Sequence, residues 1–558
     1  MSAIITNKLR IFNAQQFIES VNEQTALWAT GVAYSEGQVV LHASNLYVAV
    51  SDGTSGATAP THVTGVTSDG GVDWAFYNKS IFNNIYMGIG KHTAWPDDTN
   101  PPTPVDSTKE HNEAKNALTA LKKVGADTIT LAVPRINWTL NTRYSMYTNE
   151  LGEEVIPNSY VLTEASNQYN VYKVINCKKF VDASQGVQPV PSTVKPTGTS
   201  NEILETADGY AWKFMYSIQL EQALKFLTKD YFPVKYITSE PSDNTSAEYG
   251  QWTVQQSALS TPNSIDWVDI IDDNQNSGHS GGSGYNASIN ESSVTPGEGS
   301  TTVTLTITGA AQIANATNND YTNYALVYTK DGAATANQRK ITGWSFNAGT
   351  NVATITIDSA FAAGEGDGTG SIIIAPNVVL TAGDGTGFAA YALLQGDQVS
   401  KVVITDGGNG YTHATGEVQG NVAADAVTAA KVTPIISPTN GHGFNPVEEL
   451  NGYYAMVSLK LEYDEQETRN SVLKSVFPVT GATSTFRQVV ILTDPIDATT
   501  NNIAGQSKYR GPANADFGDG ATDFNIVGGT GKVLYIENRH PISRAIDQIE
   551  DIKVVFEF

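Results

Sequence analysis

Short apolar runs separated by Gly, Ser, Thr and Asp fill most of this chain, and this pattern is typical of strands joined by turns. Residues 301–307 show it most clearly, because Val303, Leu305 and Ile307 alternate with threonines as one face of a half-buried strand does. The chain is therefore expected to be mainly β. The predicted fold class is a β-rich α+β protein with multi-domain antiparallel sheets or sandwiches and a few helices.

Further runs of the same kind predict strands along the rest of the chain. Residues 341–346 and 352–357 flank a short turn and predict a hairpin. The last apolar run, 552–558, predicts a terminal strand that is held in a sheet. The other predicted strands cover residues 38–41, 46–50, 72–76, 81–89, 129–133, 267–271, 402–405, 454–463, 486–493 and 532–536.

Two segments have helical periodicity. Residues 13–24 predict a short amphipathic helix, and residues 107–125 predict a longer one. Ser107 and Glu110 have the spacing of a capping box, in which each side chain bonds a backbone N–H at the start of a helix. Apolar residues at helical spacing follow, and Gly125 is a natural stop.

Changes in composition predict four parts. Residues 1–27 and 81–264 have mixed character and form a predicted N-terminal core. Residues 28–80 form a small inserted β module, and residues 265–435 form an inserted β-rich domain that is rich in Gly, Ala, Thr and Asn. Residues 436–558 form a predicted C-terminal core.

A short motif recurs within the third part. Residues 281–285 read Gly-Gly-Ser-Gly-Tyr, and residues 407–411 read Gly-Gly-Asn-Gly-Tyr. Each follows a predicted strand, so the two runs indicate a repeated strand–turn unit. Two copies are too few to predict a solenoid.

Charge and cysteine content narrow the functional classes. The chain has 33 Lys+Arg against 57 Asp+Glu and a net charge of −24, and such a surface repels phosphate backbones. Nucleic acid is therefore not an expected partner. Cys177 is the sole cysteine, so no internal disulfide can form. We find neither an apolar signal core at the start nor a bilayer-spanning stretch, which predicts folding in a reducing cytoplasm and no membrane partner.

Motifs for chemistry are weak. Residues 278–282 spell G-x-S-x-G, but the strand directly before it and the helix directly after it are missing. Residues 272–278 resemble a calcium loop whose Gly is displaced by one place and whose closing Glu is absent. The eight histidines form no H-E-x-x-H pattern. The sequence therefore predicts no enzyme, no metal and no cofactor.

Flat aromatic rings concentrate in the 28–80 module and make it the best candidate for a ligand site. Exposed rings can stack on sugars, whereas a module this small needs aromatic rings for its own core. Core packing is the favoured interpretation for Tyr47 and Trp74, and both interpretations stay open for Trp28. The carbohydrate-binding candidates are Trp28, Tyr34, Tyr47 and Trp74.

Several stretches resemble one protein family. The most specific is residues 531–542, Gly-Lys-Val-Leu-Tyr-Ile-Glu-Asn-Arg-His-Pro-Ile, which continues through 547–558. Residues 486–495, 208–213 and 84–138 carry further likeness. These stretches are similar to the baseplate wedge subunit of T-even-type contractile-tailed bacteriophages, the wedge protein that is present as a dimer.

The resemblance implies a virion structural protein without catalytic residues. It implies a homodimer that binds other baseplate wedge proteins in a six-fold baseplate, after assembly in the host cytoplasm. We expect it to hold these partners together during assembly and tail contraction. The motif and interface candidates are Phe486, Arg487, Gln488, Tyr535, Glu537, Asn538, Arg539, Asp547 and Gln548.

Two interpretations remain open for the polar residues of the last motif. Glu537 and Arg539 could tie the last two strands together through a charge-assisted pair, or they could face a neighbouring subunit with Asn538. The first is favoured for Tyr535.

An alternative function comes from the 28–80 module. Its run at 53–62, with Asp69, Gly70 and Trp74, resembles small carbohydrate-binding-like modules of phage tail proteins. This likeness implies a tail-associated protein that recognises a host glycan. A third hypothesis, a tail hydrolase, needs paired carboxylates across a substrate, and the sequence offers no such pair.

Overall fold

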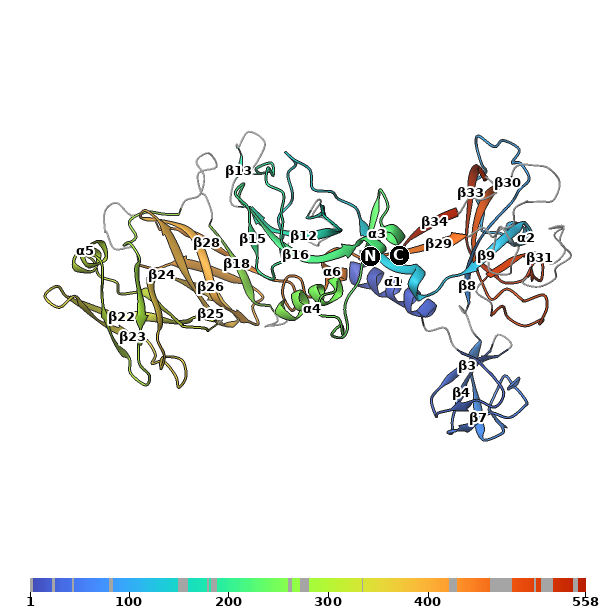
Figure 1. The fold of residues 1–558 in the computed structure, drawn as a ribbon, viewed down its shortest axis with the longest axis horizontal. Helices are drawn as coiled ribbons and strands as arrows, with labels where there is room; N and C mark the ends of the chain where they lie inside the picture. The colour runs from blue at the N-terminus through green and yellow to red at the C-terminus, as the bar shows by residue number, and fades with distance from the viewer. Residues whose placement is uncertain are drawn as a thin grey trace. The chain divides into compact units, whose positions relative to one another are not determined.

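The chain folds into two compact units, each built from separated segments (Figure 1). Unit 1 comprises Met1–Val133, Leu224–Lys235 and Gly452–Phe558, and unit 2 comprises Pro134–Ala223 and Tyr236–Asn451. The four-part division by composition stays a prediction. The computed structural model describes residues 4–22, 26–42, 45–79, 84–148, 159–177, 180–181, 188–258, 263–270, 281–333, 335–420, 429–461, 484–505, 508–512, 525–544 and 550–558.

Unit 1 is built on two sheets whose facing sides share one apolar core. The larger sheet has the strand order β32-β31-β9-β8-β30-β33, and the smaller has the order β17-β10-β29-β34. Their bounds are β8 Ile85–Gly90, β9 Leu118–Lys123, β10 Ile129–Pro134, β17 Tyr231–Val234, β29 Tyr454–Leu461, β30 Ser484–Thr493, β31 Lys508–Pro512, β32 Asn525–Ile526, β33 Lys532–Arg544 and β34 Glu550–Glu557.

Alternation along the strands explains how the sheets pack. Met87 and Ile89 of β8 enter the core that both sheets share, where Val457 and Val554 meet them from the smaller sheet. Tyr86 points to the other face of the larger sheet and packs in a second apolar cluster. Side chains that alternate between two buried faces make β8 a fully buried central strand.

The terminal strand is pinned into its sheet, as the sequence predicted. β34 pairs antiparallel with β29 from Glu550 to Glu557. The N-terminal helix α1, Asn7–Asn22, covers this region, because Phe17 contacts the rings of Phe556 and Phe558. The sequence placed this helix at 13–24, and the structure begins it earlier.

The predicted helix at 107–125 is wrong in its second half. Helix α2 spans only Thr108–Asn116, and strand β9 follows at once. Burial of β9 between β8 and β31 outweighs the helical spacing of its apolar residues, because a strand in that position pairs on both sides. Gly125 ends no helix and instead precedes the short 3-10 turn Ala126–Thr128.

Only one of the two hydrogen bonds of the predicted capping box forms at the start of α2. The Ser107 hydroxyl accepts a hydrogen bond from the Glu110 amide at 3.2 Å. The Glu110 carboxylate accepts from the Val105 amide at 2.7 Å rather than from the Ser107 amide. The cap therefore ties the start of the helix to the loop before it.

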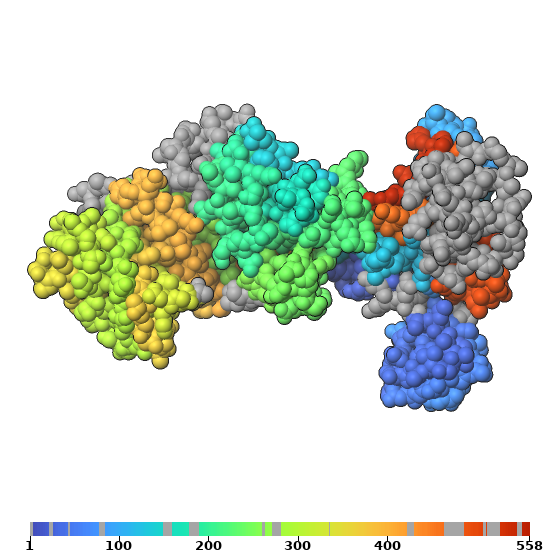
Figure 2. Space-filling model, viewed as in Figure 1, coloured from blue at the N-terminus to red at the C-terminus, as the bar shows by residue number. Residues whose placement is uncertain are grey.

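Residues 26–79 form a small β module, a compact body in the space-filling view (Figure 2). Its main sheet has the order β1-β3-β4-β7-β6, beside a two-stranded β2-β5 pair. The three strands predicted here match β3, β4 and β7. Bounds are β1 Ala26–Leu27, β2 Ala33–Tyr34, β3 Val39–His42, β4 Asn45–Ala49, β5 Gly53–Thr54, β6 Val66–Asp69 and β7 Val72–Lys79.

One half of unit 2 is a four-stranded sheet of order β11-β12-β16-β15, with helix α4 packed on β16. Tyr172, Trp212 and Val254 share its core. The elements are β11 Tyr160–Ala165, β12 Gln168–Cys177, β13 Phe180–Val181, β14 Gln188–Pro189, β15 Leu204–Glu205, β16 Tyr210–Gln219, α4 Ala247–Ala258 and α6 Pro446–Glu449. Helix α3, Leu220–Phe226, begins in unit 2 and ends in unit 1.

The other half of unit 2 is one 11-stranded sheet system. It runs β18-β28-β27-β24-β21-β22-β23-β20, with β19 and β25 on β24 and β26 on β25. The bounds are β18 Ile265–Ile270, β19 Ile289–Val294, β20 Thr302–Thr306, α5 Ala310–Asn318, β21 Tyr324–Lys330, β22 Asn337–Asn347, β23 Val352–Ile357, β24 Gly370–Gly383, β25 Thr386–Gln395, β26 Gln398–Asn409, β27 Ala414–Val418 and β28 Lys431–Ile436.

The strand predicted at 301–307 and the hairpin predicted at 341–357 are confirmed. Val303 and Leu305 of β20 are buried and the threonines that alternate with them are exposed. The predicted hairpin is β22–β23, in which Asn347 pairs with Val352. The chain is therefore mainly β, with largely antiparallel sheets.

The two copies of the recurring motif share a buried tyrosine and two glycines with positive φ. Tyr285 and Tyr411 are buried in one core. The glycines at the second and fourth positions of the motif have positive φ, a backbone region that glycine enters without strain: Gly282 65°, Gly284 83°, Gly408 61° and Gly410 76°.

The two copies also contact each other's strands reciprocally. The Val399 amide, at the start of β26, donates to the Gly281 carbonyl at 2.9 Å. The Tyr411 amide donates to the Asn263 carbonyl at 3.1 Å, just before β18. Each motif therefore anchors the strand that precedes the other copy.

No helix in the described part of the chain is long and apolar enough to cross a bilayer.

Candidate assembly interface

Residues of the two C-terminal sequence motifs meet on neighbouring strands. Phe486, Arg487 and Gln488 lie on β30, and Tyr535–Arg539 lies on β33. The strands pair antiparallel with Gln488 opposite Asn538. The register therefore brings together residues about 50 positions apart in sequence, as the Gln488–Asn538 separation of 50 shows.

Phe486 belongs to the apolar core that the two sheets share. Its side chain is 2% exposed, so its role is packing within the subunit. Phe486 therefore fixes β30 from within the subunit.

Arg487 makes the most directional contact of the group. Its Nε and Nη2 donate to the two oxygens of Asp98 at 2.8 and 2.7 Å, and its Nη1 donates to the His92 carbonyl at 2.7 Å. This fork geometry matches a carboxylate and gives a strong charge-assisted pair. Hydrogen bonds from Arg487 lower the pKa of Asp98 to about 2.

Both acceptors lie in residues 91–106, which connect β8 to α2 and which we call the strap. The Trp95 indole donates to the Arg539 carbonyl at 3.0 Å, and the Asn538 amide donates to the Pro102 carbonyl at 2.9 Å. Gln488 in turn donates to the Asn538 side chain at 2.8 Å. The motif residues thus hold the strap against β30 and β33.

Two more contacts complete this attachment. The His540 ring nitrogen Nδ1 lies 3.1 Å from the Asp98 carbonyl. Lys91 places its ammonium 4.4 Å from the centre of the Trp95 ring, a cation–π distance. Sequence reasoning missed the strap as the partner of the motif, because its contacts join residues about 390–440 positions apart, as the separations of 389 and 444 show.

The pair of Glu537 and Arg539 forms, but within one strand. Arg539 Nε lies 3.2 Å from Glu537 Oε1, and both residues belong to β33. The interpretation that this pair ties the last two strands together is therefore wrong, because residues two apart on a strand share a face. Both side chains are more than a third exposed.

Tyr535 supplies the link between the last two strands. Its ring meets Phe556 of β34 edge-on at 5.2 Å, and its hydroxyl donates to Glu537 at 3.1 Å. Burial, together with the nearby Glu537 carboxylate, raises the pKa of Tyr535 to about 12. The structural role favoured for Tyr535 agrees with this geometry.

The aromatic residues of the small module have two different environments. Tyr34, Tyr47 and Trp74 are 8%, 0% and 0% exposed and form the module's core. Their rings have no free face for stacking on a sugar, so as ligand candidates these three are corrected to core residues. Trp28 is half-buried, packs against this core and meets His42 edge-on at 5.8 Å.

A buried charged cluster in unit 2 escaped sequence reasoning. Lys173 and Lys213 lie directly opposite each other on β12 and β16. Lys173 is 1% exposed and its ammonium lies 3.3 Å from Glu449, which is 4% exposed. Like charges in opposite positions destabilise a sheet, so the nearby carboxylate offsets their repulsion.

His442 and Asp266 extend this cluster. The His442 ring nitrogens lie 3.6 Å from Glu449 and 3.8 Å from Asp266, and the ring meets Tyr147 edge-on at 4.5 Å. Burial opposes ionisation of Glu449, but the charge of Lys173 and the contact with His442 outweigh it and lower the pKa of Glu449.

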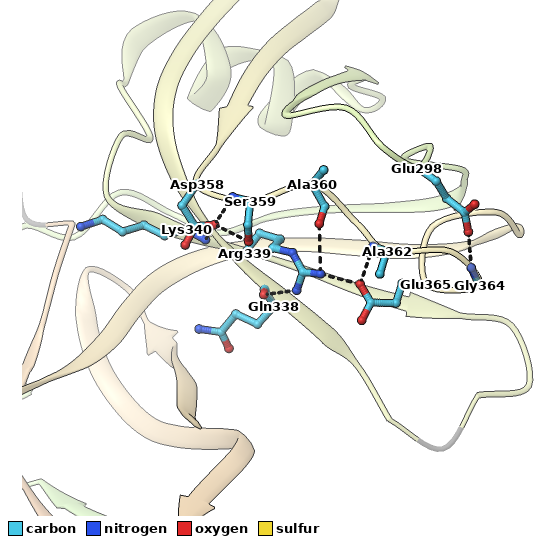
Figure 3. Close-up of polar contacts among 10 residues, drawn as sticks. All are labelled: Glu298, Gln338, Arg339, Lys340, Asp358, Ser359, Ala360, Ala362, Gly364 and Glu365. Atoms are coloured by element: carbon cyan, nitrogen blue, oxygen red, sulfur yellow. Dashed lines mark hydrogen bonds and ion pairs between the residues drawn. The ribbon is translucent and has the colours of Figure 1, made fainter. Parts of the chain in front are cut away.

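A third polar cluster lies in the inserted sheet system (Figure 3). Arg339 on β22 hydrogen-bonds the Glu365 carboxylate, donates to the Gln338 carbonyl at 2.9 Å, and lies 4.8 Å from the Phe361 ring centre. Figure 3 shows Arg339 beneath the loop after β23, which contributes Ala360, Ala362 and Glu365. All of its partners are in the same subunit, so it fastens a loop.

Other candidates fall outside the described residues. These are Asp547 and Gln548, the calcium-like run at 272–278, and Ser280 of the G-x-S-x-G letters. Within the described residues, no group of three or more His, Cys, Asp or Glu side chains could hold a metal ion.

Two comparisons relate the chain to known proteins. Residues 461–558 match the family model described as Bacteriophage T4, Gp8. The baseplate wedge protein gp8 of Enterobacteria phage T4 is 24% identical over 192 residues, which cover 30% of this chain and 57% of that protein. The chain thus spans a little over half the length of this curated relative.

The matches indicate a structural subunit of a phage tail. The mainly β fold, with the C-terminal strands β30 and β33 bound to the strap, fits this class. More specifically, the matches support a T4-type baseplate wedge subunit, and the resemblance found in the sequence is confirmed at that level.

Proposed function

We propose that this protein is a structural component of the baseplate wedge in a contractile phage tail, where it holds wedge partners together during assembly and contraction. The similarity to a baseplate wedge protein supports a structural role and a place in the virion tail baseplate. The match of residues 461–558 carries this proposal, because those residues contain the strand β33 that holds the strap.

Exposed apolar side chains support an assembly role for unit 1. Ile4 and Ile5, just before α1, and Leu9 and Phe12, in its first turns, are 78%, 63%, 49% and 55% exposed. Single exposed apolar residues are ordinary, but a group of large ones marks an interaction surface. Such a surface lowers its free energy by association.

The proposed oligomer is a homodimer that docks onto the other wedge proteins. Size-exclusion chromatography with light scattering measures the first step. The proposal predicts twice the chain mass of 59.6 kDa, and stable dimers bury roughly 800 Å² or more on each partner. A strict monomer that also fails to bind the purified wedge proteins of the same phage would contradict it.

A second candidate function, binding of a host glycan, depends on one aromatic residue. Among the four rings first considered, Trp28 alone has a partly accessible face. A glycan array with the full chain and a Trp28→Ala variant tests this function. Signal that disappears in the variant would support it, and no signal from the wild type would leave the module a structural part.

A further inference from the structure

We propose that the strap is a docking segment that inserts its outer side into an aromatic-lined groove with a basic rim on another wedge protein. This inference rests on the proposed wedge function. It goes beyond that function by assigning the surface and the chemistry of the partner.

The strap is extended because of its prolines. Residues 95–106 read Trp-Pro-Asp-Asp-Thr-Asn-Pro-Pro-Thr-Pro-Val-Asp. Proline fixes φ near −65° and forces the preceding residue into an extended conformation. Residues 101–107 accordingly have no helix or strand in the structure. An extended proline-rich segment loses little conformational entropy on binding, and aromatic grooves recognise such segments.

The inner side of the strap is fully used by the subunit itself. Asp98 accepts the Arg487 fork, and Trp95 and Pro102 bond to β33. At the far end, the Val105 amide donates to Glu110 of α2 at 2.7 Å. Together with the contacts at His92 and His540, these bonds hold the strap along its length, which pre-organises its outer side.

The outer side has the composition of a ligand. Pro96, Pro102, Pro104 and the residues on either side of Pro104 are exposed, and Val105 is 61% exposed. A proline-rich ridge that ends in an exposed valine offers apolar area to flat aromatic rings. Few interactions within the subunit need these side chains, because its contacts to the strap use Asp98, Trp95 and backbone carbonyls.

The acidic residues at the two ends of the ridge predict basic residues around the partner's groove. Asp97 and Asp106 lie at the two ends of the ridge, and the Asp106 side chain is 98% exposed although its carboxylate lies 3.1 Å from the His111 ring. Asp98, between them, is already neutralised by Arg487. Lys or Arg on the partner would therefore pair with the ends of the ridge, and this pairing weakens as salt screens it.

Reconstitution of wedges from the full chain and the other purified wedge proteins of the same phage tests the proposal. The strap variant Pro102→Ala/Pro104→Ala/Val105→Ser should bind about tenfold or more weakly in sedimentation velocity. Its thermal unfolding should match the wild type, because the retained backbone carbonyl of residue 102 still accepts from Asn538.

Matched controls separate the strap from general surface effects. Val63→Ser changes a valine with a similar exposure of 57% in the small module and should bind like the wild type. Asp97→Asn/Asp106→Asn should weaken binding at low salt and remove most of its salt dependence.

The outcomes distinguish failure of the strap as a docking segment from failure of the proposed wedge function. Wild-type chain that enters wedges together with an equally competent strap variant overturns the strap and leaves the proposed function intact. Wild-type chain that enters no wedge overturns the proposed function and the strap with it. Should the strap variant unfold, Asp97→Asn/Asp106→Asn, which alters only exposed groups, decides the matter through its salt dependence.

Discussion

At the scale of single residues, Arg487 of the β30 motif holds the strap in place. Its fork on Asp98 joins β30 to the strap, and the hydrogen bonds lower the pKa of Asp98 to about 2. A carboxyl whose pKa is lower in the folded state than its usual value of about 3.9 stabilises the fold above that value. That contribution is lost as the pH falls through the folded pKa.

The first prediction follows from this sign. The stability difference between the wild type and Asp98→Asn should be constant above about pH 5 and should shrink between about pH 4 and pH 2. Hydrogen exchange of the strap amides at several pH values measures it. A difference that does not change with pH would contradict the assigned role of the ion pair.

The buried cluster in unit 2 gives a second prediction. Glu449→Gln leaves Lys173, which is 1% exposed, beside an uncharged group. Removal of one partner from a buried ion pair costs about 3 kcal/mol of unfolding free energy. Chemical denaturation measures the change.

A double variant is the matched control for this cluster. Lys173→Met/Glu449→Leu removes both members of the ion pair and should cost less than Glu449→Gln alone, because Lys173 is then not left buried beside an uncharged group. A double variant that is less stable than the single one would show that the two charges do not act as a pair.

At the scale of elements, the recurring glycine motif gives a third prediction. A Cβ at residue 408 would lie 2.4 Å from the Thr386 carbonyl oxygen, whereas one at residue 410 would meet only Gly385 Cα at 4.0 Å. Both positions have positive φ, so alanine is strained at either. Gly408→Ala should therefore destabilise by about 1–3 kcal/mol more than Gly410→Ala.

Chemical denaturation of the two glycine variants tests this order. Equal losses would mean that the backbone around Thr386 yields to the added methyl group. In that case positive φ alone would explain the two glycines.

Strand periodicity predicted part of the fold, and its failure at β9 has a physical cause. β20 and the β22–β23 hairpin followed directly from alternation, because one face of each is solvated. β9 did not, because its residues are buried in a sheet and their spacing also fits a helix. Pairing with β8 and β31 decides between helix and strand. β8 lies before the strap and β31 lies far along the chain, so the local spacing of residues in β9 cannot predict this pairing.

The candidate site was predictable in part for the same reason. The motif residues on β30 and β33 were identified, but their partners on the strap were not. The opposed lysines of unit 2 were also invisible, because only the register of β12 and β16 places them side by side.

At the scale of the whole molecule, the chain is acidic and mainly β, and the proposed role is mechanical. A net charge of −24 favours neighbours that carry basic surfaces. The exposed apolar residues at the start of the chain and the outer side of the strap both belong to unit 1 and are surfaces that neighbours could cover. A protein with several docking surfaces suits an assembly whose interfaces must change when the tail contracts.

The most direct test of the central claim is a cryo-electron microscopy map of the intact tail of the phage that encodes this chain. The account predicts density for the chain in the baseplate wedge, with unit 1 against other wedge proteins. Density for it elsewhere in the virion, or purified virions without it, would contradict the account.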